Sequence, residues 1–206
     1  MDNFLLISLS VCLAFAINGE ISKLHGDQET DSDFIQAALD DTPDLVKFLL
    51  KEGANINATD EDGKTALMKA SNNGRYETVK FLIDNEADVN AKDTNGKTPL
   101  MFAAAFDNSK IVRLLVDNGA NINATDNSGW STLIYAAYDG RDRAVRALLR
   151  KGADADYALK YATEHLHSII DYYNERSTSG VGGYQKSVDT INENNTFLRR
   201  LQSYVE

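Results

Sequence analysis

The hydrophobic positions of this chain recur in four blocks whose internal spacing predicts helices. In each block, apolar residues fall at i, i+1, i+3, i+4 and i+5, which gives a helix a wide apolar face that is buried on more than one side. We therefore predict one helix in each block. The blocks are Leu45-Val46-x-Phe48-Leu49-Leu50, Thr78-Val79-x-Phe81-Leu82-Ile83, Ile111-Val112-x-Leu114-Leu115-Val116 and Ala144-Val145-x-Ala147-Leu148-Leu149.

A shorter helix is predicted before these blocks. Thr65 and Thr98 open the segments TALMKA and TPLMFA, and threonine is a natural N-cap. Pro99 stands at the first helical position, where its missing N–H is not needed. Small residues in and after these segments, and at the equivalent positions of the next copy, allow neighbouring helices to approach closely. They are Ala70, Ala103, Ala104, Ala136 and Ala137.

The two helices and the loop between them repeat with a period of 33 residues. Gly63, Gly96 and Gly129 follow this spacing. A closing motif follows the same frame in four copies, as the sequence stretches GANINA, EADVNA, GANINA and GADADY. Asp60, Asp93 and Asp126 repeat it, and so do Leu67, Leu100 and Leu133. Self-similarity at one fixed period is typical of a solenoid built from stacked units.

These motifs resemble the ankyrin repeat, whose T-P-L-H-x-A core is nearly matched by residues 98–103 and whose units close with G-A-D/N-V/I-N-A. The resemblance covers residues 30–156 and implies an all-α solenoid of stacked helix pairs with β-hairpin loops. It divides that range into four repeats, 30–63, 64–96, 97–129 and 130–156. Ser32 to Ala38 replaces the T-P-L motif in the first copy, which we interpret as an N-terminal cap.

Three departures from the family pattern carry expectations. Glu86 replaces the glycine that ends a second helix, so we expect a non-glycine residue in the left-handed conformation, at a cost on the order of 1 kcal/mol. Asp107 replaces the glycine found as Gly74 and Gly140. The family's histidine is Met68, Met101 or Ile134, so we expect the hydrogen bond that it normally makes at the helix cap to be absent.

Residues 1–19 are typical of a signal peptide. The mainly apolar run from Phe4 to Ile17 is 14 residues long, too short to span a bilayer, and Ala14-Phe15-Ala16 supplies a small-x-small pattern, so we expect cleavage after Ala16 or Gly19. The segment lacks Lys and Arg, which is atypical. With residues 20–29 as a linker, we expect a periplasmic or secreted protein, of the bacterial ankyrin type, with no membrane span after cleavage.

The C-terminal region, residues 157–206, is expected to be a helical cap and tail. From Ala158 to Glu175, apolar and aromatic residues share one helical face, and a second helix is expected from about Gln185. The face of the first helix consists of Ala158, Tyr161, Ala162, His165, Leu166, Ile169 and Tyr173.

Charge and side-chain chemistry narrow the possible functions. The net charge of −10 opposes phosphate neutralisation, so we expect no nucleic-acid binding and a partner that is basic or neutral, although such acidity also serves solubility. Cys12 is the only cysteine, and His165 and His167 point to different faces of their helix. The GVGG stretch at 180–183 is no phosphate loop. We expect no catalytic residue, no metal and no cofactor.

The Asn- and Asp-rich loops allow two further interpretations. A run such as Asn55-x-Asn57-x-x-Asp60-x-Asp62 superficially suggests calcium, but such residues also form tight turns and bond to the backbone, which explains their recurrence better. Asn57, Asn123 and Asn194 match the glycosylation acceptor pattern, two of them as repeat-frame asparagines.

The resemblance also implies a binding surface. Ankyrin proteins usually bind partners through a concave face made of the hairpin tips and the exposed side of the first helix of each unit. Among these positions Phe106, Trp130 and Tyr138 are expected to lie near one another and to anchor a partner, unless Trp130 only packs internally. The implied partner-binding residues are Glu61, Asp62, Lys64, Asn72, Asn73, Thr94, Asn95, Lys97, Ala105, Phe106, Asn127, Ser128, Trp130, Tyr138 and Asp139.

The function that these observations favour is a non-catalytic, monomeric protein–protein interaction module. One concrete form is an inhibitor or immunity-like protein, an acidic binder of a basic toxin or enzyme. An adaptor that organises envelope proteins through several weak partners is the alternative, and an enzyme is disfavoured because no catalytic constellation is present.

Overall fold

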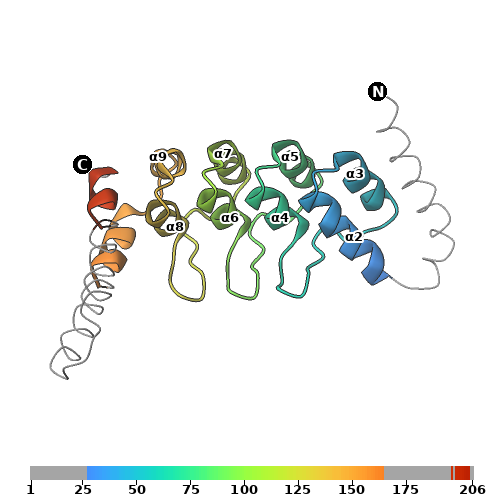
Figure 1. Ribbon diagram of the computed structural model, residues 1–206, viewed down its shortest axis with the longest axis horizontal. Coiled ribbons are helices and arrows are strands. Elements are labelled where there is room, and N and C mark those ends of the chain that lie inside the picture. The colour runs from blue at the N-terminus through green and yellow to red at the C-terminus, as the bar shows by residue number, and fades with distance from the viewer. Residues whose placement is uncertain (1–26, 165–195, 197, 205–206) are drawn as a thin grey trace, which may run out of the picture.

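The computed structural model describes residues 27–164, 196 and 198–204, which form a row of helix pairs (Figure 1). Residues 1–26, where the signal peptide and most of the linker are expected, lie outside the described residues. Within the described residues the first helix begins at Asp27, so residues 27–29 are helical rather than linker. In chain order the helices are α2 (Asp27–Leu39), α3 (Pro43–Lys51), α4 (Ala66–Asn72), α5 (Tyr76–Asp84), α6 (Pro99–Ala105), α7 (Ser109–Asp117), α8 (Thr132–Tyr138) and α9 (Asp142–Arg150).

The helices form two layers. Helices α2, α4, α6 and α8 make the lower row in Figure 1, and α3, α5, α7 and α9 make the upper row. Three finger loops, residues 58–65, 91–98 and 124–131, hang from the lower row. Single β-bridges join Thr59 to Thr65 and Thr125 to Ser131, and the described residues contain no longer strand. The predicted all-α solenoid is therefore confirmed.

The core runs continuously through the array because the buried positions repeat with the helices. Val46, Val79, Val112 and Val145 are completely buried at the same place in the four outer helices. The predicted inner-helix residues Leu67, Leu100 and Leu133 are at most 1% exposed, as are the alanines that separate neighbouring helices. Each repeat therefore buries its apolar faces against the next, as expected for a stacked solenoid.

Thr65 and Thr98 directly precede α4 and α6 as predicted, and Ser131 precedes α8, but the Thr98 hydroxyl is buried without a hydrogen-bond partner, and one expectation about the caps is wrong. The Thr65 hydroxyl accepts the Met68 N–H at 3.3 Å, and the Ser131 hydroxyl accepts the Ile134 N–H at 3.3 Å. In the reverse direction the Thr65 N–H donates to the Met68 sulfur at 3.5 Å. The Thr98 N–H donates to the Met101 sulfur at the same distance. The cap hydrogen bond is therefore retained in these two repeats, because a thioether sulfur is a weak acceptor that can take the place of a histidine nitrogen.

Two non-glycine residues adopt the left-handed conformation at the predicted departures from the family pattern. Glu86 has φ +68° and Asp107 has φ +58°. Asp107 gains a compensating contact, because its carboxylate accepts the Ala144 N–H at 2.9 Å. The expectation of left-handed backbone at Glu86 is confirmed.

Asparagine side chains join each repeat to the next. The Asn57 side-chain oxygen accepts the Asp88 N–H at 2.9 Å, and Asn90 accepts the Asn121 N–H at 2.7 Å. At the next junction Asn123 accepts the Asp154 N–H at 2.9 Å. The recurrence of these asparagines is thus explained by side-chain bonds to the backbone, as predicted.

The C-terminal segments take the place of a further repeat. Residues 155–164 and 198–204 are helical and pack on the last repeat at the far end of the row (Figure 1). Ala158 and Ala162 are buried there as predicted, and Leu201 is completely buried. The remainder of the expected cap helix, from His165 onward, lies outside the described residues.

The contacts of these segments copy those made between repeats. Arg141 donates to the Ala105 carbonyl at 2.7 Å, at the end of α6. Arg200 makes the corresponding contact to the Ala137 carbonyl at 3.3 Å, at the end of α8. The hydroxyl of Tyr157 donates to the Gly129 carbonyl in the last finger at 2.8 Å. Polar groups that a fifth repeat would satisfy are therefore satisfied by the C-terminal segments.

No helix in the described ranges combines the length and the apolar character that a membrane span requires.

Candidate functional site

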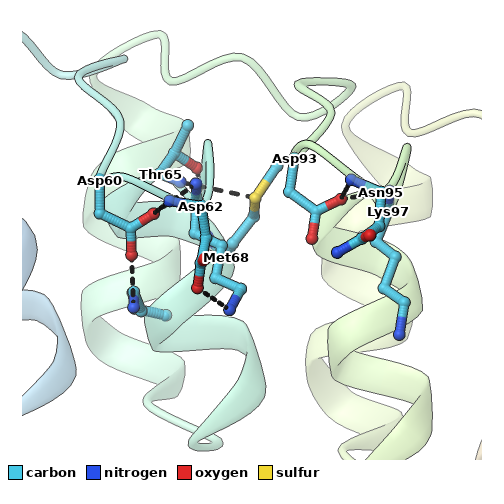
Figure 2. A network of polar contacts seen from close by, with 9 residues as sticks. Asp60, Asp62, Thr65, Met68, Asp93, Asn95 and Lys97 are labelled. Atoms are coloured by element: carbon cyan, nitrogen blue, oxygen red, sulfur yellow. Dashed lines mark hydrogen bonds and ion pairs between the residues drawn. The ribbon is translucent and has the colours of Figure 1, made fainter.

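The predicted concave face comprises the three finger loops and the exposed side of α4, α6 and α8. Each finger is closed by an aspartate whose side chain bonds to its own loop. The Oδ1 atom of Asp60 accepts the Asp62 N–H at 3.0 Å and the Lys64 N–H at 2.8 Å (Figure 2). Asp93 does the same for Asn95 and Lys97, at 2.9 and 2.7 Å. Two backbone N–H bonds to one carboxylate oxygen hold each tip in a tight turn.

Asp126 completes the series in the third finger, where it accepts the N–H groups of Ser128 and Trp130, both at 2.8 Å. Neighbouring fingers are also bonded to each other. The Thr94 N–H donates to the Asp62 carbonyl at 3.0 Å, and the Asn127 N–H donates to the Asn95 carbonyl at 3.0 Å. The tips therefore form one connected edge rather than three independent loops.

The second carboxylate oxygen of these aspartates has a different environment in each finger. The Oδ2 atom of Asp60 pairs with the Lys69 ammonium at 2.6 Å. That of Asp126 accepts the Tyr135 hydroxyl, also at 2.6 Å. That of Asp93 is buried and has no hydrogen-bond partner. Figure 2 shows the Asp60 and Asp93 carboxylates in the same orientation on neighbouring fingers, with a dashed line from the second oxygen of Asp60 only.

These contacts shift the pKa values of Asp60 and Tyr135. Burial alone would raise the pKa of Asp60, but the hydrogen bond from Lys69 and the backbone N–H of Lys64 outweigh it and lower the pKa. Burial, together with the hydrogen bond to Asp126, raises the pKa of Tyr135. Tyr135 therefore stays protonated and continues to donate well above neutral pH.

The aromatic residues expected on this face are only partly brought together. Trp130 is half-buried and packs against the ring of Tyr138 with centroids 5.1 Å apart. It packs equally closely on Tyr135, at 5.0 Å, a neighbour that the sequence analysis missed. Phe106 is 55% exposed, and among the described residues its ring does not stack on Trp130 or Tyr138.

The polar residues expected on this face lie at the finger tips and at the ends of the inner helices. Glu61, Asp62, Thr94, Asn95, Asn127 and Ser128 are exposed tip residues, and Lys64 and Lys97 are half-buried beside them. Lys64 pairs with Asp62 at 2.8 Å, and the Lys97 ammonium lies 4.7 Å from the centre of the Tyr135 ring.

Most of the expected residues at the ends of the inner helices take part in hydrogen bonds within the array. Asn73 donates to the Leu39 carbonyl at 3.3 Å and so helps to join α4 to the preceding repeat. Asn72 donates to the Asn73 side chain at 3.0 Å. Ala105 is half-buried, and its carbonyl is the acceptor for Arg141. Asp139 is exposed at the end of α8.

A groove of about 820 Å³ lies at the N-terminal end of the concave face, between α2 and the first finger. The sequence analysis did not identify it. Its acidic lining residues are Asp31, Asp60, Glu61 and Asp62, and Lys69 is its basic residue. A signal for it was present in the acidic character of the first copy, but the sequence alone did not show that α2 lies beside the first finger.

In the part of the chain that the structure describes, no three His, Cys, Asp or Glu side chains are grouped so as to hold a metal ion.

Comparison with known proteins identifies one family. The family model described as ankyrin repeats (3 copies) matches residues 34–126 and 93–158, which together include all four outer helices and all three fingers. No curated protein matches the chain.

Proposed function

We propose that this chain, which belongs to the ankyrin-repeat family, is a non-catalytic module that binds a protein partner on its concave face. One observation carries the proposal. Phe106 and Tyr138 are 55% and 46% exposed at the C-terminal ends of α6 and α8. Large aromatic side chains are the most common anchors of protein interfaces, and the fold does not require apolar residues at these two positions.

The construction of the concave face supports the same proposal. The fingers are bonded to one another through the backbone and closed by the aspartates, so little conformational entropy remains to be lost when a partner docks. A preorganised surface of this kind binds more tightly than a flexible loop with the same contacts.

The acidity of the chain suggests the character of the partner. A net charge of −10, together with the acidic lining of the groove beside the first finger, favours a basic protein, because complementary charge increases the rate of encounter. In its most specific form the proposal is a monomeric inhibitor or immunity-like protein that acts in the periplasm or outside the cell.

The test compares partner capture by the full chain and by two variants. The first variant combines Phe106→Ala and Tyr138→Ala. The second is Phe48→Ala, a matched control, because Phe48 is 45% exposed on the outer helix α3. Trp130 is left unchanged, because it packs on both Tyr135 and Tyr138 and its removal would disturb two ring contacts at once. Far-ultraviolet circular dichroism establishes that each variant is folded.

We expect one predominant partner to be captured by the full chain and by Phe48→Ala, and lost by the double variant. Capture that is equal for all three proteins would place the binding site elsewhere. Several weakly held partners in place of a single one would favour an adaptor.

A further inference from the structure

The middle finger contains a buried hydrogen-bond acceptor that the chain itself does not satisfy. Asp93 is 6% exposed, and its Oδ2 atom has no hydrogen-bond partner. Its other oxygen is occupied by the N–H groups of Asn95 and Lys97, so the orientation of the carboxylate is fixed. Leaving a buried acceptor without a donor is unfavourable, because the oxygen has lost its hydrogen bonds to water and gained none in return.

The repeat frame explains why this oxygen has no donor. The donors to Asp60 and Asp126 are Lys69 and Tyr135, each nine residues after its aspartate on the inner helix. The residue nine positions after Asp93 is Phe102, which has no polar atom in its side chain. The position nine residues after the aspartate therefore supplies a donor in the first and third copies of this frame, and a side chain without a donor in the second.

The chemistry around Asp93 favours a cation as the missing donor. The acceptor is a carboxylate, which bonds most strongly to a charged donor. In the first finger the chain itself places a lysine ammonium on the equivalent oxygen at 2.6 Å. The Lys97 ammonium lies over the Tyr135 ring at 4.7 Å, so an aromatic ring of this face already accommodates a cation.

We propose that the concave face binds its protein partner by receiving a lysine side chain of that partner at Asp93, where the partner's ammonium donates to Oδ2. This inference rests on the proposed function, because it specifies the partner of the same surface. Since Oδ2 is covered in the chain alone, the lysine must displace a neighbouring side chain as it enters. The buried Oδ2 atom then gains the hydrogen bond that it lacks in the chain alone, and this gain contributes to the affinity.

A substitution at Phe102 separates this contact from general charge attraction. Phe102→Tyr adds only a hydroxyl and leaves the net charge unchanged. In the third finger the equivalent tyrosine hydroxyl reaches its aspartate at 2.6 Å. Phe102→Tyr should therefore satisfy Asp93 from within the chain and make the partner's lysine redundant. Phe102→Leu is the matched control, because it changes the same position and supplies no donor.

The probe is a peptide selected against the full chain from a random display library. Each lysine of the selected peptide is replaced in turn by norleucine, which keeps the chain length and removes the ammonium. Affinities for the wild type, Phe102→Tyr and Phe102→Leu are measured by fluorescence anisotropy. The Phe106→Ala and Tyr138→Ala double variant reports whether the peptide occupies the concave face.

We expect one lysine whose replacement weakens binding to the wild type by about tenfold or more. The same replacement should have less than about a twofold effect on binding to Phe102→Tyr, and the tenfold effect should return in Phe102→Leu. The proposal is overturned if no lysine is coupled to Phe102→Tyr while the double variant still abolishes binding. If no peptide is selected, or if the double variant binds the peptide normally, the proposed function fails and this inference fails with it.

Discussion

The exchange of phenylalanine and tyrosine between the inner helices of the second and third fingers' repeats, at residues 102 and 135, tests how much one hydrogen bond to a buried aspartate stabilises the fold. Tyr135→Phe removes the hydroxyl that donates to Asp126 at 2.6 Å. The substitution keeps the ring that packs on Trp130 at 5.0 Å and carries the Lys97 ammonium at 4.7 Å. The change in stability therefore reports the hydrogen bond and little else.

The magnitude follows from the burial of the acceptor. Asp126 is 9% exposed, so solvent cannot fully replace the lost donor. A hydrogen bond to a charged group contributes about 1.5–3 kcal/mol, and Tyr135 is itself only half-buried, so we expect Tyr135→Phe to lower the free energy of unfolding by about 2 kcal/mol. Phe102→Tyr should raise it by about 1 kcal/mol, less than the loss because the neighbours of residue 102 must accommodate the added oxygen.

Urea unfolding followed by far-ultraviolet circular dichroism measures both changes. The comparison requires equal denaturant slopes, because repeat arrays can lose cooperativity when one unit is weakened. If Tyr135→Phe costs less than about 0.5 kcal/mol, water satisfies Asp126 as well as the hydroxyl does. If Phe102→Tyr destabilises the chain, the side chain of residue 102 does not reach Asp93. The repeat spacing then fails to explain why the Oδ2 atom of Asp93 has no donor.

Three further predictions concern pH, capping and backbone strain. The pKa of Tyr135 is higher in the folded than in the unfolded chain, and burial with the hydrogen bond to Asp142 raises the pKa of Tyr204 to about 12. The stability that these two groups contribute is therefore present below about pH 10 and is lost as the pH rises above it. Urea unfolding should show a smaller loss of stability between about pH 9 and about pH 11 in Tyr135→Phe than in the wild type. Arg200→Ala should cost about 1 kcal/mol because the Ala137 carbonyl loses its donor in a partly exposed site, and hydrogen exchange should accelerate in α8 and α9 more than in α4 and α5. Glu86→Gly should stabilise the chain by about 0.5 kcal/mol, because glycine relieves the strain of the left-handed backbone. Asp107→Gly should destabilise the chain by about 1 kcal/mol, because the hydrogen bond from the Ala144 N–H is lost. A shift of the thermal unfolding temperature in the same direction for both variants would contradict this account.

The candidate site was only partly predictable. The finger tips and the exposure of Phe106 and Tyr138 follow from the repeat frame, because each position inherits its place from its equivalents one period away. Tyr135 was missed because the frame assigns it to an inner helix, where an aromatic residue suggests packing rather than a bond to Asp126. Phe102 was overlooked for the same reason.

The sequence by itself determined the architecture of this protein. The period of 33 residues places the helices, the buried valines at one position of all four outer helices specify the face that is buried, and Thr65 marks the start of α4. Even the left-handed backbone at Glu86 follows from the missing glycine.

Only the tertiary structure decided which polar atoms are satisfied. Whether a methionine sulfur receives the Thr65 N–H depends on geometry too fine for a sequence pattern, and the contact of Arg200 with Ala137 joins residues 63 positions apart. The unfilled oxygen of Asp93 emerges only when the three fingers are compared in space. Hydrogen bonds depend on distances of a few tenths of an ångström, whereas a hydrophobic pattern specifies only which face is buried.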